Sequence, residues 1–148
     1  MAIFLTGVSF VVEYNSCLVV TRHILLPAQD MDVKSICKEI FVTPELPTDP
    51  QKLSQIIKPY DAIIGSFPLN LQVQILQNKK ALIVFEMKSA GVYDTKEDAQ
   101  AKAFQYPDRT AILAPSKEGE KFRLMIYQGL KLIKEIKVID DWIIRHQD

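Results

Sequence analysis

The stretch Asp61-Ala-Ile-Ile-Gly-Ser-Phe-Pro-Leu-Asn-Leu71 decides the fold of this chain. Its first residues, Asp61–Ile64, form a short apolar run that predicts a strand. The next four residues are typical of a turn, and Leu71–Gln77 then has the apolar spacing of a helix. A continuous apolar run, Ala81–Phe85, follows and indicates a strand buried on both faces. Strand, turn, helix and strand in this order predict a parallel sheet covered by helices.

On the N-terminal side of this stretch we expect two strands and two helices, namely strands Ala2–Thr6 and Leu18–Leu26 and helices Asp32–Ile40 and Gln51–Lys58. The intervening segment Val8–Tyr14 fits either a strand or the first turns of a helix. Prolines at positions 44, 47 and 50 exclude a long helix between the two expected helices, and they predict an ordered loop there.

On the C-terminal side we expect a loop at Lys88–Tyr93, a helix at Thr95–Phe104 capped by Thr95, a strand at Thr110–Ala114, and a final strand or docking segment at Val138–His146. Apolar residues recur at spacings of three and four from Glu118 to Ile136, which predicts a long helix. A hairpin of Phe122–Tyr127 and Leu130–Ile139 is the alternative. The whole pattern predicts an α/β fold, with a Rossmann-like, mostly parallel sheet and helices on both faces, as one domain over residues 1–148.

The composition excludes several classes of protein. The 148 residues include 18 Lys and Arg against 18 Asp and Glu, which argues against binding of long nucleic acid through many phosphates. Hydrophobic residues make up 48% of the chain, as in globular proteins. A membrane helix needs about 20 apolar residues, and the sequence has neither such a stretch nor a signal peptide. We therefore expect a cytoplasmic protein without a membrane partner.

The cysteine and histidine content argues against a metal enzyme. Cys17 and Cys37 have neither metal-ligand nor redox spacing, so we expect both to stay reduced and buried. The chain has only 2 histidines, which argues against a zinc hydrolase. No metal and no cofactor are expected.

Two N-terminal segments carry residues suited to phosphate. In Thr6-Gly7-Val8-Ser9, a glycine flanked by hydroxyl residues can cradle a phosphate with backbone N–H groups, although an ordinary tight turn explains it equally. In Thr21-Arg22-His23, the arginine can bind a phosphodiester and the histidine can titrate near neutral pH. The alternative is a strand in which Arg22 faces solvent and His23 faces a polar neighbour.

The best-formed candidate pocket follows the strand Asp61–Ile64. Gly65 permits a close turn, Ser66 offers a hydroxyl, and the following helix presents N–H groups without intrahelical partners. Asn70 either contacts a ligand or caps its own helix. Lys88 and Lys117 are expected after later strands, where they supply positive charge to a phosphate or are simply solvated.

The segment Gly65-Ser-Phe-Pro-Leu-Asn-Leu71 resembles a motif of small CRISPR-associated accessory proteins of type III systems. Those proteins carry a strand, then Gly-Thr/Ser-Leu-Pro-Val-Asn-Leu, then a helix and another strand. Their first strand leads into a Thr-Arg-His loop. One alignment places Phe4-Leu5-Thr6 on that strand, with Gly7 and Val8 at the Arg and His positions. The other alignment uses Thr21-Arg22-His23 itself and requires an N-terminal extension.

The resemblance implies a homodimer that binds a cyclic oligoadenylate, a small RNA second messenger, across the dimer interface. Cyclic tetra-adenylate is the expected ligand. A metal-independent ring nuclease would cleave it by attack of a ribose 2′-OH and so damp type III antiviral signalling. Catalysis is then expected at Arg22, His23 and Ser66, and ligand contacts are expected at Thr6, Gly7, Ser9, Gly65, Ser66, Asn70 and Lys88. The alternative is a non-enzymatic interaction or regulatory protein that uses the expected helix Phe122–Ile136 and Trp142.

Overall fold

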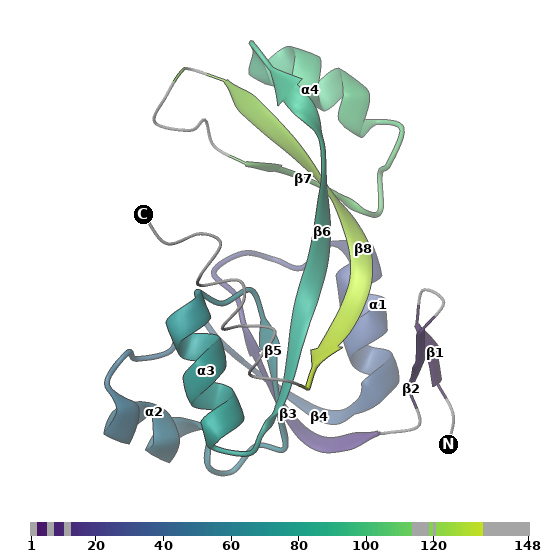
Figure 1. The fold of residues 1–148 in the computed structure, drawn as a ribbon. Helices are drawn as coiled ribbons and strands as arrows, with labels where there is room; N and C mark the ends of the chain where they lie inside the picture. The colour runs from purple at the N-terminus through teal and green to yellow at the C-terminus, as the bar shows by residue number, and fades with distance from the viewer. Residues whose placement is uncertain (1–2, 6–7, 11–12, 114–118, 120, 135–148) are drawn as a thin grey trace.

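The structure is a computed structural model of the chain, and it describes residues 3–5, 8–10, 13–113, 119 and 121–134. Within these residues a six-stranded sheet, the main sheet, has the order β4-β3-β5-β6-β8-β7 (Figure 1). Its strands are β3 (Tyr14–Val20), β4 (Cys37–Thr43), β5 (Ala62–Gly65), β6 (Ala81–Tyr93), β7 (Thr110–Leu113) and β8 (Phe122–Ile133). The helices are α1 (Pro27–Ile36), α2 (Pro50–Ile57), α3 (Leu69–Gln77) and α4 (Lys96–Ala103).

The expected α/β architecture is confirmed, but the main sheet is mixed and not a strictly parallel Rossmann-like sheet. Strands β4, β3, β5 and β6 pair in parallel, whereas β8 is antiparallel to both β6 and β7. The two antiparallel pairings come from the segment that we expected to be a long helix. The prediction of a helix over 118–136 is therefore wrong for the described part, Phe122–Ile133.

The parallel strands bury side chains on both faces, and successive residues of each strand belong to opposite layers. On β5, Ala62 and Ile64 pack in one core with α1, while Ile63 packs in the other with α2 and α3. Leu82 and Ile83 of β6 divide between the same two cores. This alternation explains why these strands read as continuous apolar runs in the sequence. Helices accordingly cover both faces of the parallel part (Figure 1).

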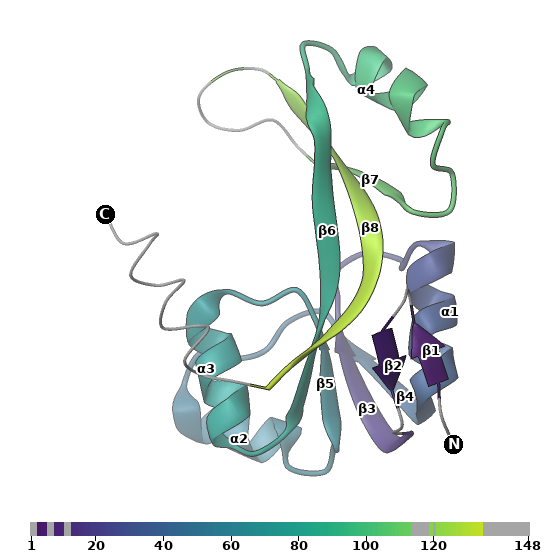
Figure 2. The same ribbon diagram turned by 45° about the vertical axis from the view of Figure 1, so that its right-hand side comes forward.

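Beyond Phe85 the long strands β6 and β8 leave the parallel part and continue as a twisted ribbon (Figure 2). The ribbon carries β7 on the outer side of β8 and α4 at its far end; we call this part, residues 86–113 and 121–127, the arm. The sequence prediction of a loop over 88–93 is wrong, because β6 extends to Tyr93. Ala99 of α4 is buried in the arm, and Thr95 caps α4 as predicted by accepting a 3.1 Å hydrogen bond from the Asp98 N–H.

Three N-terminal boundaries also differ from expectation. The first expected strand forms β1 (Ile3–Leu5), which pairs antiparallel with β2 (Val8–Phe10) in a separate sheet. The strand expected at 18–26 is β3, which ends at Val20. The helix expected over 32–40 is α1, which starts at Pro27, a residue suited to the first helical position, and ends at Ile36.

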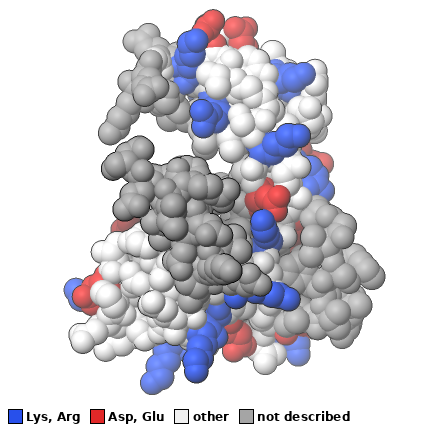
Figure 3. Space-filling model, in the orientation of Figure 1, with Lys and Arg blue, Asp and Glu red and all other residues white. Residues whose placement is uncertain are grey.

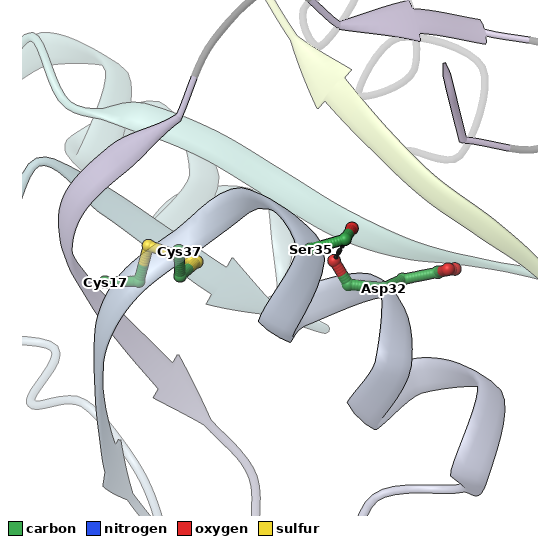
Figure 4. Close-up of a disulfide and its surroundings, with 4 residues drawn as sticks. All are labelled: Cys17, Asp32, Ser35 and Cys37. Atoms are coloured by element: carbon green, nitrogen blue, oxygen red, sulfur yellow. Dashed lines mark hydrogen bonds between the residues drawn. A yellow bond between two sulfur atoms is a disulfide. The ribbon is translucent and has the colours of Figure 1, made fainter. Parts of the chain in front are cut away.

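The cysteines were expected to be buried and reduced, and the second half of that prediction is wrong. Cys17 on β3 and Cys37 at the start of β4 form a disulfide with their Cα atoms 6.1 Å apart (Figure 4). Both residues are buried in the core beneath α1. The crossover through α1 brings the two strands side by side, which the spacing in the sequence did not indicate.

The remaining sequence expectations fall outside this description. The segment Val138–His146, with Trp142, lies outside the described residues, as does Lys117. Among the described helices, none has the length and apolarity that crossing a membrane requires.

Candidate functional site

The candidate site lies between β3 and β5, from which the connections to the next parallel strands run in opposite directions across the sheet. The chain leaves β3 toward α1 on one face of the sheet, and it leaves the neighbouring β5 toward α3 on the opposite face. In open α/β sheets, ligands bind at the carboxyl ends of strands whose connections diverge in this way. We call the ends of β4, β3 and β5, with the residues that follow each of them, the carboxyl edge.

The strand register aligns the two candidate loops. Val20 is the partner of Gly65, so Thr21 and Ser66 each stand one residue beyond a matched pair. A Cβ atom on Gly65 would lie 2.7 Å from the Val20 carbonyl oxygen and 3.0 Å from the Phe67 ring. Only glycine allows this close approach of the two strand ends. Gly65 was expected to permit a close turn, and it also permits the close contact between the ends of β3 and β5.

Thr21 fixes the shape of the loop after β3. Its N–H donates to the Thr43 carbonyl oxygen at 2.9 Å, which ties the loop to the end of β4. Its hydroxyl donates to the His23 carbonyl oxygen at 2.8 Å and accepts from the His23 N–H at 3.1 Å. Arg22 and His23 are both exposed, so their side chains are accessible from solvent.

Ser66 and the start of α3 form the neighbouring part of the carboxyl edge. Ser66 and Asn70 are exposed, whereas Phe67 is half-buried and packs against the core beneath α3. The N-cap of α3 is Pro68, which makes no side-chain cap hydrogen bond, so Asn70 does not cap the helix. The first N–H groups of a helix have no intrahelical partner and favour an anion. Here α3 begins at Leu69, three residues after Ser66, and among these first groups the Leu71 N–H already bonds the Pro68 carbonyl oxygen at 3.1 Å.

The other predicted ligand residues are not brought into this group. Lys88 lies on β6 opposite Ile126, four residues beyond the partner of Gly65, which places it about 13 Å farther along the strand. Ser9 belongs to the separate β1–β2 sheet, and Thr6 and Gly7 lie outside the described residues. The structure therefore brings together Arg22, His23, Gly65, Ser66 and Asn70.

The structure adds one charged residue that the sequence did not indicate. Glu45, in the proline-rich loop after β4, forms an ion pair with Arg22, and both side chains are about two-thirds exposed, at 66% and 65%. The sequence places these residues 23 positions apart, and only the pairing of β4 with β3 makes them neighbours. The carboxyl edge thus has both charge signs, as does the face shown in Figure 3.

The chemistry available at this edge is that of hydrogen-bond donors, the imidazole of His23 and the carboxylate of Glu45. Arginine binds phosphate oxygens in a planar, bidentate geometry, and hydroxyl and backbone N–H groups donate to the same oxygens. Histidine can accept or release a proton near neutral pH. In the part of the chain that the structure describes, no group of three or more His, Cys, Asp or Glu side chains is placed to hold a metal ion.

Comparisons of the chain with protein-family models, with curated proteins and with solved structures found no match. The features that bear on function are therefore the geometry of the carboxyl edge and the resemblance of the Gly65–Leu71 segment.

Proposed function

We propose that this protein binds a cyclic oligoadenylate, with cyclic tetra-adenylate as the ligand, at the carboxyl edge. The observation that carries the proposal is the placement of Thr21-Arg22-His23 and Gly65-Ser66 on adjacent strands in matched register. These are the two segments that the resemblance pairs, provided that the Thr-Arg-His alignment is the one that applies. The position of β3 beside β5 in the main sheet favours that alignment over the one that begins at Phe4.

The carboxyl edge suits a ligand that has several phosphates but presents few negative charges to each binding site. The chain as a whole is electrically neutral, with 18 basic and 18 acidic residues. Arg22 supplies the positive charge, while the Ser66 hydroxyl and the first N–H groups of α3 supply neutral donors. Donors of this kind suit a single phosphodiester and do not attract a long nucleic acid strand.

We propose further that the bound ring is cleaved without a metal ion. His23 accepts the proton of a ribose 2′-OH as its oxygen attacks the adjacent phosphorus. The bond from phosphorus to the 5′-oxygen of the next nucleotide breaks, and that oxygen takes a proton from water. The products are a 2′,3′-cyclic phosphate and a 5′-hydroxyl. Arg22 and Ser66 stabilise the negative charge on the phosphate oxygens as the new bond forms.

The proposed function also implies a homodimer and a role in signalling. A Rossmann-like domain would place two carboxyl edges around one ring in a homodimer, which matches the symmetry of a cyclic ligand. Cleavage of the messenger would damp type III CRISPR signalling in the cytoplasm.

The test uses the full chain with radiolabelled cyclic tetra-adenylate in EDTA. We expect a shifted band on a native gel and, with time, linear product on a denaturing gel. His23→Asn should retain binding and lose at least about 100-fold in cleavage rate, as expected for loss of a general base. Arg22→Gln should weaken binding, while Arg123→Gln, an exposed arginine on the arm, serves as the matched control. Absence of both binding and product with the wild-type chain overturns the proposal.

A second candidate function is a non-enzymatic interaction through the arm. Phe104 at the end of α4 is 82% exposed, Val92 on β6 is 52% exposed, and Leu113 on β7 is 47% exposed. A contiguous patch of such exposed apolar residues would be typical of a binding surface. The sequence predicted this function for a helix over Phe122–Ile136 with Trp142, but Phe122–Ile133 form β8, and Trp142 lies outside the described residues. Assembly in the absence of nucleotide, lost in Phe104→Ser but retained in Arg22→Gln, would favour this alternative.

A further inference from the structure

We propose that Glu45 is a positioning residue that holds Arg22 out of the ligand site until a phosphate displaces it. This inference rests on the proposed function of the carboxyl edge. Before the ligand binds, the Arg22 guanidinium lies with the Glu45 carboxylate.

The strand order gives Arg22 two alternative partners. It follows β3, which lies between β4 and β5. Glu45 follows β4 on one side, and Ser66 with the start of α3 follows β5 on the other. Neighbouring strands are about 4.8 Å apart, so the long arginine side chain can reach either side but not both. In the structure it pairs with Glu45.

Both members of the ion pair extend from anchored backbone. The Thr21 N–H bonds the Thr43 carbonyl oxygen at 2.9 Å, which fixes the loop before Arg22 against the end of β4. On the other strand, the Thr43 hydroxyl donates to the Glu45 carbonyl oxygen at 3.3 Å, and the next residue, Leu46, is buried in the core. The carboxylate is therefore presented to the arginine by the fold, and the pair does not depend on two free side chains meeting.

The Glu45 carboxylate occupies the position of a phosphate with respect to Arg22. Carboxylate and phosphate oxygens bind the guanidinium group in the same planar geometry. A ligand must therefore break the Arg22–Glu45 pair before Arg22 can turn toward the β5 side. Because the pair is exposed, its strength is modest, and a ligand with several donors at the site can overcome it.

The experiment measures the dissociation constant of cyclic tetra-adenylate for Glu45→Gln and for the wild-type chain. We expect Glu45→Gln to bind about two- to fivefold more tightly at low salt, since an exposed ion pair no longer competes. Salt weakens the pair as well as ligand binding, so the affinity of the wild-type chain should fall less steeply with salt than that of the variant. Glu39→Gln is the matched control, because Glu39 is exposed on β4, the strand that precedes Glu45, and lies about 13 Å before Thr43.

A double substitution tests whether the effect passes through Arg22. In the Arg22→Gln background, Glu45→Gln should give no further gain in affinity. An equal gain in that background, or an equal gain in Glu39→Gln, would show a general charge effect and overturn the inference. Binding by the wild-type chain without any gain in Glu45→Gln would overturn this inference alone. Failure of both proteins to bind would overturn the proposed function, and this inference with it.

Discussion

The carbonyl oxygen of Val20 lies 2.7 Å from the position that a Cβ atom on Gly65 would occupy. The ends of β3 and β5 thus leave no space for a side chain at Gly65, and the loops that carry Arg22 and Ser66 begin at this contact.

Gly65→Ala should push the two strand ends apart. A core substitution that adds a methyl group without space for it costs about 1–3 kcal/mol, so we expect a fall of that size in the free energy of unfolding by urea. Gly119→Ala is the control, because among the described residues the nearest atom to a Cβ there is on the Lys121 side chain at 4.0 Å, an ordinary contact. An unchanged stability in Gly65→Ala would contradict the close approach.

The disulfide should contribute strongly to stability. Cys17 and Cys37 are 20 residues apart, and closing a loop of this length constrains the unfolded chain by about 3 kcal/mol. We expect a reductant to lower the free energy of unfolding by that amount, with mass spectrometry confirming the change in thiol state. The double variant Cys17→Ser/Cys37→Ser should show no response to reductant.

Tyr127 connects the arm to α1. Its hydroxyl donates a 2.6 Å hydrogen bond to the Asp32 carboxylate, and its N–H donates to the Arg109 carbonyl oxygen at 2.5 Å. Tyr127→Phe removes only the first bond, so we expect a loss of about 1 kcal/mol or slightly more in unfolding free energy. Tyr60→Phe is the control, since the Tyr60 hydroxyl makes no hydrogen bond to another described residue.

Because of the Tyr127 hydroxyl, we expect the free energy of unfolding to fall at alkaline pH. Burial, and then the hydrogen bond to Asp32, raise the pKa of Tyr127 well above its usual value. Above pH 10 the unfolded chain releases this proton while the folded chain keeps it, so unfolding becomes easier as the pH rises. The slope is about 1.4 kcal/mol per pH unit for one proton, and Tyr127→Phe should remove it. Burial also raises the pKa of Tyr14, which leaves a remaining slope in the variant.

Lys88 provides a check on the extent of the binding surface. The alternation of β6 puts Lys88 on the face opposite Met87, which packs with the core beneath α1. At about 13 Å beyond the partner of Gly65, it is too far along the strand for direct contact with a phosphate held by Ser66. We therefore expect Lys88→Gln to change the affinity for cyclic tetra-adenylate by less than about twofold, the effect of a screened surface charge. A larger loss would extend the site along the arm.

The parallel part of the sheet was predictable because its signals are local. Apolar runs mark β5 and the start of β6, and Pro59 marks the end of α2. Strand β4 was missed because its apolar run is limited to Ile40–Val42, and Lys38 and Glu39 before it are exposed at the edge of the sheet. Cys37 and Ile40 then fitted the end of a helix by spacing alone.

The misassignment of β8 has a different physical cause. Gly129 adopts a positive φ of 126°, and the register of β8 against β6 shifts between Glu86 and Met87. This bulge at Gln128 puts Tyr127 and Leu130 on the same face at a spacing of three, while Leu124 is buried on the opposite face. A strand with such a bulge has the apolar spacing of a helix.

The site was partly predictable for the same reasons. Gly65, Ser66 and Asn70 follow a strand that the sequence marks clearly, and they occupy the edge expected for them. The pairing of Arg22 with Glu45 depends on the neighbours of an edge strand that the sequence did not reveal. Contacts between segments distant in sequence follow from the strand order, which local patterns do not contain.

The length of β6 has a mechanical consequence. A 13-residue strand is about 43 Å long, and it runs from the parallel part into the arm with β8 paired beside it. Among the described residues the two parts are joined by paired strands, and the register shift between Glu86 and Met87 lies at the base of the arm. We therefore expect the arm to move by bending and twisting of the ribbon at this bulge.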